Sequence, residues 1–153
     1  MNERPLSEMT QDEIKEVVRE KYSKVAKEPA VTFNFPVGKT FALKVGYPKE
    51  ILDKLPQSMS ESFTGANNPQ SFTDLKKGEV VLDLGCGAGL DLYFYAKATG
   101  KNGRVFGLDI SEDMVNKAKA NMEATGIKSV EIKCGHSDNL PFPDNFFDVA
   151  ASN

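Results

Sequence analysis

A run of glycines at alternate positions constrains the fold of this chain more than any other feature. Residues 80–89 read VVLDLGCGAG, so a short, almost wholly apolar segment is followed at once by glycines at positions 85, 87 and 89. Because glycine has no Cβ, the backbone can turn tightly there and approach a ligand closely. The run is therefore predicted to be a buried strand, a tight turn and the start of a helix.

After residue 79, short apolar segments alternate with segments of helical periodicity. Strands are predicted at residues 80–84, 104–108, 130–134 and 147–151, and helices at 89–98 and 111–126. Continuous apolar strands separated by helices indicate a parallel sheet covered on both faces. The expected fold is α/β, a doubly wound, Rossmann-like and mostly parallel sheet. Ligands of such sheets bind beyond the carboxyl ends of the strands.

The first part of the chain is predicted to be a helical extension. Thr10 and Glu13 have the spacing of a capping box, and apolar residues follow at helical intervals, which predicts a helix over 10–26. Another helix is expected after Pro48, and the Ser-, Gly- and Asn-rich residues 58–69 are expected to form a loop. We therefore divide the chain into an extension, residues 1–69, and a ligand-binding domain, residues 70–153. The extension either packs against the domain or serves as a lid over its site.

The composition argues against several functional classes. The 153 residues include 19 basic and 22 acidic side chains, and this net charge of −3 offers no footprint for nucleic acid or an anionic membrane. No apolar run approaches the roughly 20 residues that span a bilayer. The polar, acidic N-terminus does not have the pattern of a signal peptide. A cytoplasmic location is expected.

The two cysteines and the single histidine do not predict a metal site. Cys86 and Cys134 make no disulfide framework. Together with His136 they could bind zinc, but their spacing is poor and a four-ligand site would lack a ligand. Cys86 occupies a small-residue position in the glycine run, and Cys134 is expected in the core at the end of a buried strand.

An acid in the following strand indicates an adenosine ligand. Asp109 ends the second predicted strand, 20 residues after Gly89, where a carboxylate can accept both ribose hydroxyls. The dinucleotide fingerprint G-x-G-x-x-G would put its third glycine at Leu90, whereas this chain reads G-x-G-x-G. A pyrophosphate needs the helix N-terminus close to its charges. S-adenosylmethionine has no phosphate, and Asp83 is placed to meet its ammonium group directly or through water. The pattern favours S-adenosylmethionine over NAD.

Three segments in order resemble successive motifs of class I S-adenosylmethionine-dependent methyltransferases. They are VVLDLGCGAGLD, LDIS at residues 108–111, and GHSDNLPFPDNFFDVAASN at the end of the sequence. The resemblance implies glycines 85, 87 and 89 around the methionine moiety, Asp109 on the ribose, and Ile110 and Met114 near the adenine. Met114 is equally well explained as ordinary core.

Related methyltransferases carry an acid after the third strand that accepts a hydrogen bond from the adenine amino group, where this chain has His136. Neutral histidine can accept through one ring nitrogen. We rank His136 as an adenine neighbour first, a surface residue second and a catalytic base third, and Asp138 as a substitute for the acid. The candidate cofactor-binding residues are Asp83, Gly85, Cys86, Gly87, Gly89, Asp109, Ile110, Met114, His136, Ser137, Asp138 and Asn153.

The region before the domain is similar to the arsenite methyltransferase group. The similar segments are VREKYSKVA, GYPKEILDKLP and FTGANNP. Enzymes of that group hold trivalent arsenic with cysteines around the loop that corresponds to residues 63–69. This loop has no cysteine here, and amide side chains do not replace thiolates for a soft element.

The resemblance also implies strands beyond the fourth, so the sequence is interpreted as a truncated domain. A sheet that ends at its fourth strand leaves an edge and a helix-packing face uncovered, which predicts exposed apolar surface or self-association. Methyl transfer from a sulfonium mainly requires alignment of donor and nucleophile, and we assign no catalytic residue. The leading hypothesis is the cofactor-binding part of a methyltransferase with a small-molecule acceptor. The alternatives are an NAD(P)-dependent oxidoreductase and a non-catalytic cofactor-binding module.

Overall fold

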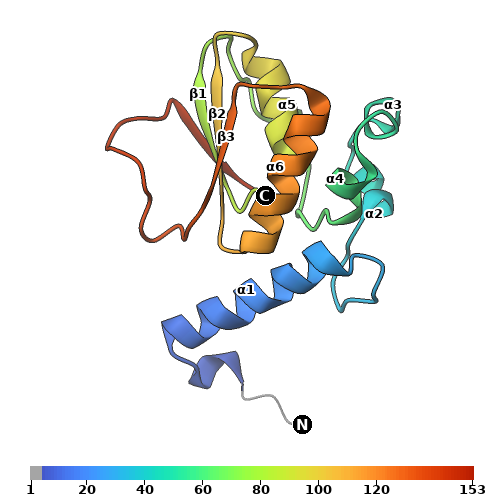
Figure 1. Cartoon of the computed structure of the whole chain (residues 1–153), viewed down its shortest axis with the longest axis vertical. Coiled ribbons are helices and arrows are strands. Elements are labelled where there is room, and N and C mark those ends of the chain that lie inside the picture. Colours follow the sequence, from blue (N-terminus) through green and yellow to red (C-terminus); the bar gives the residue numbers. More distant parts are fainter. Residues whose placement is uncertain (1–4) are drawn as a thin grey trace.

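The computed structural model describes residues 5–153 and contains a helical N-terminal region followed by a parallel sheet with two long helices (Figure 1). The N-terminal elements are η1 (Leu6–Glu8), α1 (Gln11–Lys27), α2 (Lys39–Lys44), α3 (Lys49–Leu52), α4 (Gln57–Glu61) and η2 (Pro69–Ser71). The remaining elements are β1 (Val80–Leu84), α5 (Leu90–Thr99), β2 (Arg104–Asp109), α6 (Glu112–Thr125), β3 (Val130–Cys134) and β4 (Val149–Ser152).

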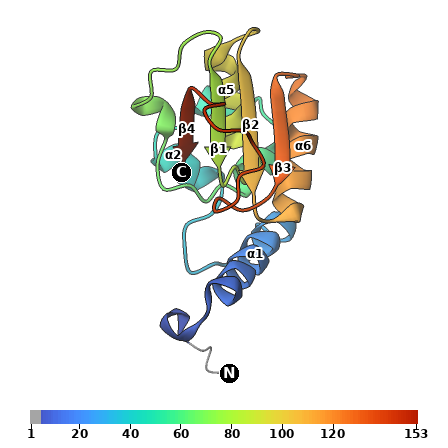
Figure 2. The ribbon, with the colours of Figure 1, turned by 90° about the vertical axis from the view of Figure 1, so that its left-hand side faces the viewer.

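The sheet has the order β3-β2-β1-β4, and every neighbouring pair is parallel. This confirms the expected Rossmann-like fold. The chain moves outward from β1 to β2 and β3, then crosses back to place β4 on the other side of β1 (Figure 2). The direction of winding therefore changes at β1, and the carboxyl end of a strand at such a switch point is where open α/β sheets bind ligands.

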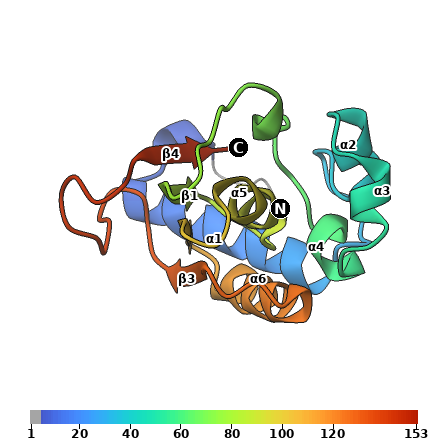
Figure 3. The same ribbon diagram turned by 90° about the horizontal axis from the view of Figure 1, so that it is seen from above.

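The two faces of the sheet are covered in different ways (Figure 3). Helices α5 and α6 cover one face, and the helix-free connection at residues 135–148 crosses the other. Phe142, Phe146 and Phe147 from this connection pack against Phe106, with ring centroids 5.4 to 5.6 Å away. Phe106 is consequently only 3% exposed. The expectation of an uncovered packing face is thus wrong for the middle of the sheet, because an aromatic cluster takes the place of a helix.

Helix α1 lies across the carboxyl end of the sheet and contacts α6 (Figures 1 and 2). Its start is the expected capping box, since the Thr10 hydroxyl accepts from the Glu13 N–H and the Glu13 carboxylate accepts from the Thr10 N–H. At its other end, Nζ of Lys117 on α6 donates to the carbonyl of Ala26 at 3.0 Å and to Oε1 of Glu61 at 3.0 Å. These contacts fix the N-terminal region on the domain.

Most predicted boundaries lie within one residue of the structure, and two differ by more. Residues 58–69 are not all loop, because α4 occupies Gln57–Glu61. Pro56, whose φ is already −51°, stands immediately before this helix, and Met59 is fully buried, so packing stabilises a turn that composition alone disfavours. Strand β4 begins at Val149 rather than at Phe147, because Phe147 belongs to the aromatic cluster and the Asp148 carboxylate accepts from the N–H of Val80 at 2.8 Å.

Candidate donor-binding site

The glycine run forms an open cradle between β1 and α5. Gly85 and Gly87 have φ values of +74° and +51°, a region that residues with a Cβ rarely adopt. A Cβ placed on either residue would meet no atom within 4 Å, so the space above the loop is free for a ligand. Gly89 precedes the first residue of α5, and a Cβ there would lie 3.4 Å from the Cβ of Ala118 on α6. The third glycine therefore lets α5 and α6 pack closely together.

Asp109 lies at the carboxyl end of β2 and is bonded to the glycine loop. Its Oδ2 accepts from the N–H of Gly87 at 2.8 Å, and its Oδ1 accepts from the N–H of Ser111 at 2.9 Å. The side chain is buried, and burial raises the pKa of Asp109, although hydrogen bonds from Ser111 and Gly87 act in the opposite direction. Each carboxylate oxygen has a second acceptor direction available for a ligand hydroxyl.

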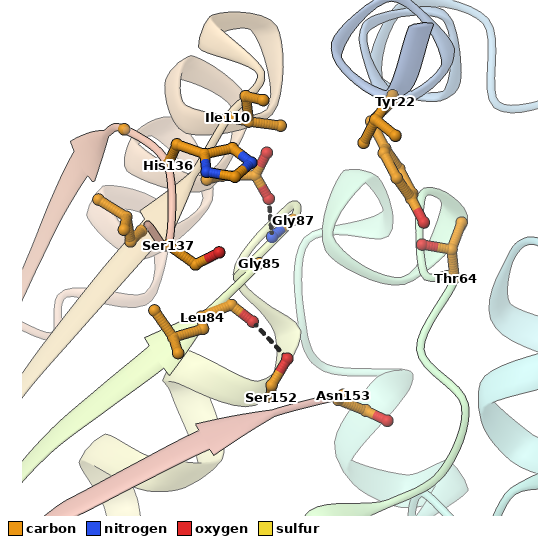
Figure 4. A pocket seen from close by; sticks show the side chains of 14 residues that line it. Tyr22, Thr64, Leu84, Gly85, Gly87, Ile110, His136, Ser137, Ser152 and Asn153 are labelled. Atoms are coloured by element: carbon orange, nitrogen blue, oxygen red, sulfur yellow. Dashed lines mark hydrogen bonds between the residues drawn. The ribbon is translucent and has the colours of Figure 1, made fainter. Parts of the chain in front are cut away.

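A hollow of about 260 Å³ lies over this loop at the carboxyl end of the sheet. Figure 4 shows that Ile110, His136 and Ser137 form one wall and that Tyr22 of α1 and Thr64 stand on the opposite side. Ser152 and Asn153 at the end of β4 complete the floor beside Leu84. The complete lining is Val18, Tyr22, Thr64, Leu84, Gly85, Gly87, Leu108, Asp109, Ile110, Gly135, His136, Ser137, Ser152 and Asn153.

His136 is held by charged groups outside the hollow. Its Nδ1 lies 2.7 Å from Oδ1 of Asp138, and Oδ2 of Asp138 accepts from Nζ of Lys15 on α1 at 2.5 Å. The hydrogen bond from Lys15 and then that from His136 lower the pKa of Asp138. Asp138 therefore orients His136 and joins α1 to this wall, and it does not itself line the hollow.

A smaller cavity adjoins the hollow on the side of α5. Gly85, Gly87, Thr64 and Asn153 line both cavities, and Asp91 from the first turn of α5 lines only the smaller one. Asp91 is 6% exposed, and burial raises its pKa, while hydrogen bonds from Tyr47 and Asn153 lower it. Asp83 on β1 is 2% exposed, and burial together with the charges of Asp91 and Asp109 raises its pKa. Three carboxylates therefore gather around the loop, which favours a cationic ligand.

The structure brings most of the candidate residues to the two cavities. Seven of them line the main hollow, namely Gly85, Gly87, Asp109, Ile110, His136, Ser137 and Asn153. Cys86 lines the smaller cavity, and burial raises the pKa of its thiol. Asp83 is buried on β1, and Gly89 ends the glycine run against Ala118 of α6. Met114 is fully buried in a cluster with Val25, Ala26 and Ala88, and its own side chain lines neither cavity.

The expectation for Cys134 is wrong. Its side chain is exposed at the end of β3, an edge strand among residues 5–153, because no strand or helix covers that end. Within the same residues no group of three or more His, Cys, Asp or Glu side chains is arranged to hold a metal ion. No described helix is long and apolar enough to cross a membrane.

Sequence reasoning missed the contributions of the N-terminal region and of α5 to the site. Tyr22 and Thr64 line the hollow although they precede the glycine run by many residues. Asp91 was not among the predicted site residues either, although the sequence around it contains a feature that could have indicated its role. It is the only acidic residue of α5, whose sequence LDLYFYAKAT is otherwise apolar over its first turns. A carboxylate in such a buried position usually has a specific partner or role.

The fold and this cradle define the class I methyltransferase domain, and the comparisons agree. A family model described as a methyltransferase domain matches residues 75–153, which is more than half of the chain. The chain therefore belongs to this family, whose cofactor is S-adenosylmethionine. The glycine cradle and the buried carboxylates are suited to that cationic molecule.

Known proteins similar to this chain include methyltransferases of small molecules. The arsenite methyltransferase of Halobacterium salinarum is 38% identical over 89 residues, which cover 58% of this chain and 23% of that protein. A demethylmenaquinone methyltransferase of Bacillus cereus is 43% identical over 75 residues, covering 49% of this chain and 32% of that protein. The crystal structure of a SAM-dependent methyltransferase from Aquifex aeolicus superposes with a TM-score of 0.55 and 29% identity, covering 75% of this chain and 52% of that one. The chain thus spans only a quarter to a third of the two curated relatives.

Proposed function

We propose that this chain binds S-adenosylmethionine in the hollow over the glycine loop and forms the donor-binding part of an enzyme that methylates a small molecule. The observation that carries this proposal is the open cradle at Gly85 and Gly87, bonded directly to the Asp109 carboxylate. A phosphate ligand does not suit a site surrounded by three buried carboxylates, whereas a sulfonium or an ammonium group does.

The proposed placement of the donor follows the two cavities. Gly85 and Gly87 lie along the methionine moiety, and Asp109 accepts the ribose hydroxyls. Ile110, His136 and Ser137 surround the adenine, because they form the wall beyond Asp109. Asp83 acts from beneath the loop through its charge. Met114, fully buried among Val25, Ala26 and Ala88, supports α1 and the loop from within the core.

The bound donor supplies an electrophilic methyl group, and the chain provides alignment and exclusion of water. In-line displacement at a sulfonium requires little covalent help, so holding the two reactants at near-attack distance is the main task. We propose that residues 1–69 form an extension that closes the acceptor side, since Tyr22 and Thr64 stand opposite the donor wall. We assign no catalytic base.

The acceptor is proposed to be a small molecule that does not need thiolate ligands. Residues 63–69 contain no cysteine. Cys86 is buried, and Cys134 is exposed at the end of β3, so the two thiols do not face a common cavity. A cytoplasmic location and self-association through the free edge of β4 remain parts of this proposal.

Calorimetry with S-adenosylhomocysteine and NAD tests the proposal. We expect the chain to bind S-adenosylhomocysteine with a stoichiometry of one and to show no heat with NAD. Binding of NAD alone would support an oxidoreductase and contradict the proposal. Transfer of a labelled methyl group from S-adenosylmethionine to any metabolite would exclude a purely non-catalytic module.

A further inference from the structure

The side chain of Asn153 joins three segments that are far apart in the sequence. Its Oδ1 accepts from the N–H of Asn67 at 2.8 Å, and its Nδ2 donates to the carbonyl of the same residue at 2.8 Å. Nδ2 also lies 2.9 Å from Oδ2 of Asp91 and 3.2 Å from Oη of Tyr47. The amide group therefore pairs with the backbone of the 64–68 segment and reaches the first turn of α5.

Tyr47 binds the other oxygen of the same carboxylate. Its hydroxyl donates to Oδ1 of Asp91 at 2.5 Å, and the tyrosine side chain is 2% exposed. The ring is fixed by an edge contact with Phe63, centroid to centroid 5.0 Å, and by a tilted contact with Phe94 at 5.5 Å. Both oxygens of Asp91 are thus oriented by donors from outside its own helix.

Close approach of the backbone at Gly65 is required for this arrangement. A Cβ on Gly65 would lie 2.4 Å from Nδ2 and 2.7 Å from Cγ of Asn153. Its backbone dihedral does not fall in the left-handed region that favours glycine, so the requirement is purely steric. The 64–68 segment consequently passes directly over the Asn153 amide group.

We propose that Tyr47 and Asn153 are positioning residues that hold the Asp91 carboxylate beside the amino-acid end of the methyl donor. This inference rests on the proposed function. Asp91 and Asn153 both line the smaller cavity, which continues the hollow past Gly85 and Gly87 toward α5. A carboxylate oxygen accepts more than one hydrogen bond, so Asp91 can bind an ammonium group while it remains bonded to Tyr47 and Asn153.

The arrangement makes the N-terminal region part of the donor site. Tyr47 lies between α2 and α3, and it reaches an acid on α5 that the glycine loop alone would leave unpaired. An unpaired buried carboxylate tends to take up a proton, which would remove its attraction for a cation. The two donors therefore orient the Asp91 side chain and oppose the rise in its pKa that burial causes.

Two ligands that differ only at the amino-acid end can distinguish a positioning role at Asp91 from a general effect on the stability of the fold. S-adenosylhomocysteine carries the α-ammonium group, whereas 5′-methylthioadenosine lacks the amino acid and keeps the adenosine. Calorimetry should compare both ligands with the unmodified chain and with the variants Tyr47→Phe, Asn153→Ala and Asp91→Asn. We expect each variant to lower the affinity for S-adenosylhomocysteine about tenfold, which is the effect of losing one hydrogen bond to a charged group. Binding of 5′-methylthioadenosine should stay within about twofold.

Tyr93→Phe is the matched control. Tyr93 lies on the same helix as Asp91 and makes an edge contact with Phe94 at 5.4 Å, but its hydroxyl has no hydrogen bond within residues 5–153. It should leave both affinities unchanged. Gly65→Ala is a second kind of variant, because it leaves the Tyr47 and Asp91 side chains chemically unchanged. Its methyl group would displace the Asn153 amide and would also lie 2.8 Å from Cε2 of Phe63. It should give the same selective loss, and circular dichroism checks that each variant is folded.

The outcomes distinguish this inference from the proposed function. If the unmodified chain binds neither adenosine ligand, the proposed function fails. If it binds both, the donor site stands. If Tyr47→Phe and Gly65→Ala then lower the affinities for the two ligands equally, or lower neither affinity, the positioning role is overturned. If Tyr47→Phe does not fold, the affinities of Gly65→Ala for the two ligands test the positioning role by the same criterion.

Discussion

The backbone N–H of Gly87 donates a 2.8 Å hydrogen bond to Oδ2 of Asp109, which joins the loop after β1 to the end of β2. The carboxylate thus has a structural task in addition to its proposed contact with the ribose. A donor-site acid that also holds the loop should be sensitive to removal, because both the ligand contact and the loop geometry depend on it.

Asp109→Ala tests this double role. We expect its affinity for S-adenosylhomocysteine to fall about 30-fold or more, since hydrogen bonds to charged groups contribute roughly 1.5–3 kcal/mol each. Calorimetry measures the change, and Asp144→Ala, at an exposed position in the 135–148 connection, serves as the control. An affinity within twofold of the unmodified chain would place the ribose elsewhere.

Gly85→Ala should weaken donor binding because its methyl group would project into the open space above the loop. Gly126 offers a close control, since its φ of +72° nearly equals the +74° of Gly85 and a Cβ there also meets no atom within 4 Å. Both variants should lose about 1 kcal/mol of folding stability from backbone strain. Only Gly85→Ala should lose affinity for S-adenosylhomocysteine, and equal affinities would show that the cradle is not the binding surface.

The buried acids predict a dependence of folding stability on pH. Burial, and then the charges of Asp91 and Asp109, raise the pKa of Asp83 well above its usual 3.8. The folded state therefore binds more protons than the unfolded state at pH values above 3.8. The free energy of unfolding consequently falls as the pH rises from 3.8 toward the raised pKa of the folded chain. Asp83→Asn should stabilise the unliganded chain at neutral pH, because the amide does not carry the charge that burial penalises.

Urea unfolding at pH values of about 5 and about 7.5 measures this effect in the unmodified chain and in Asp83→Asn. The variant should also bind S-adenosylhomocysteine more weakly, as expected where a site trades stability for function. Asp144→Asn, at the exposed position, should change neither property. A destabilised Asp83→Asn at neutral pH would indicate that the carboxylate is charged and well compensated.

Lys117 is predicted to hold the N-terminal region against α6. Its ammonium donates to Ala26, Glu61 and Ser62 at 2.7 to 3.0 Å. Lys117→Met should cost ~1–3 kcal/mol of stability, because it removes the donor shared by three partly buried acceptors. Lys119→Met, at an exposed position of the same helix, should stay within about 0.5 kcal/mol. Limited proteolysis should cut the Lys117→Met variant faster near residues 28–38, and an unchanged pattern would contradict the prediction.

The free edge of β4 is the proposed surface for self-association. This strand pairs only with β1 among residues 5–153, and Ala150 on it is exposed. Sedimentation equilibrium should show association that increases with concentration, and Ala150→Lys should reduce it, because charges on an edge strand oppose pairing. A monomer at all concentrations would contradict this proposal.

The local signals in the sequence were sufficient for most of the fold. The capping boundary at Thr10, the strand at 80–84 and the strand at 130–134 lie where they were predicted. Helix α6 also lies between the expected Ser111 and Gly126, which are its N-cap and C-cap residues. Caps, apolar runs and glycines act over a few residues, so their consequences can be inferred from a single segment.

Patterns along the chain are enough to predict the parallel sheet, the glycine loop and the acid at the end of β2, since each depends on near neighbours. The meeting of Tyr47 and Asn153 at Asp91, and the position of Tyr22 opposite His136, follow from packing between distant segments. These pairs come together because the extension folds back over the carboxyl ends of the strands. No local pattern encodes such contacts, because they depend on how separate elements pack.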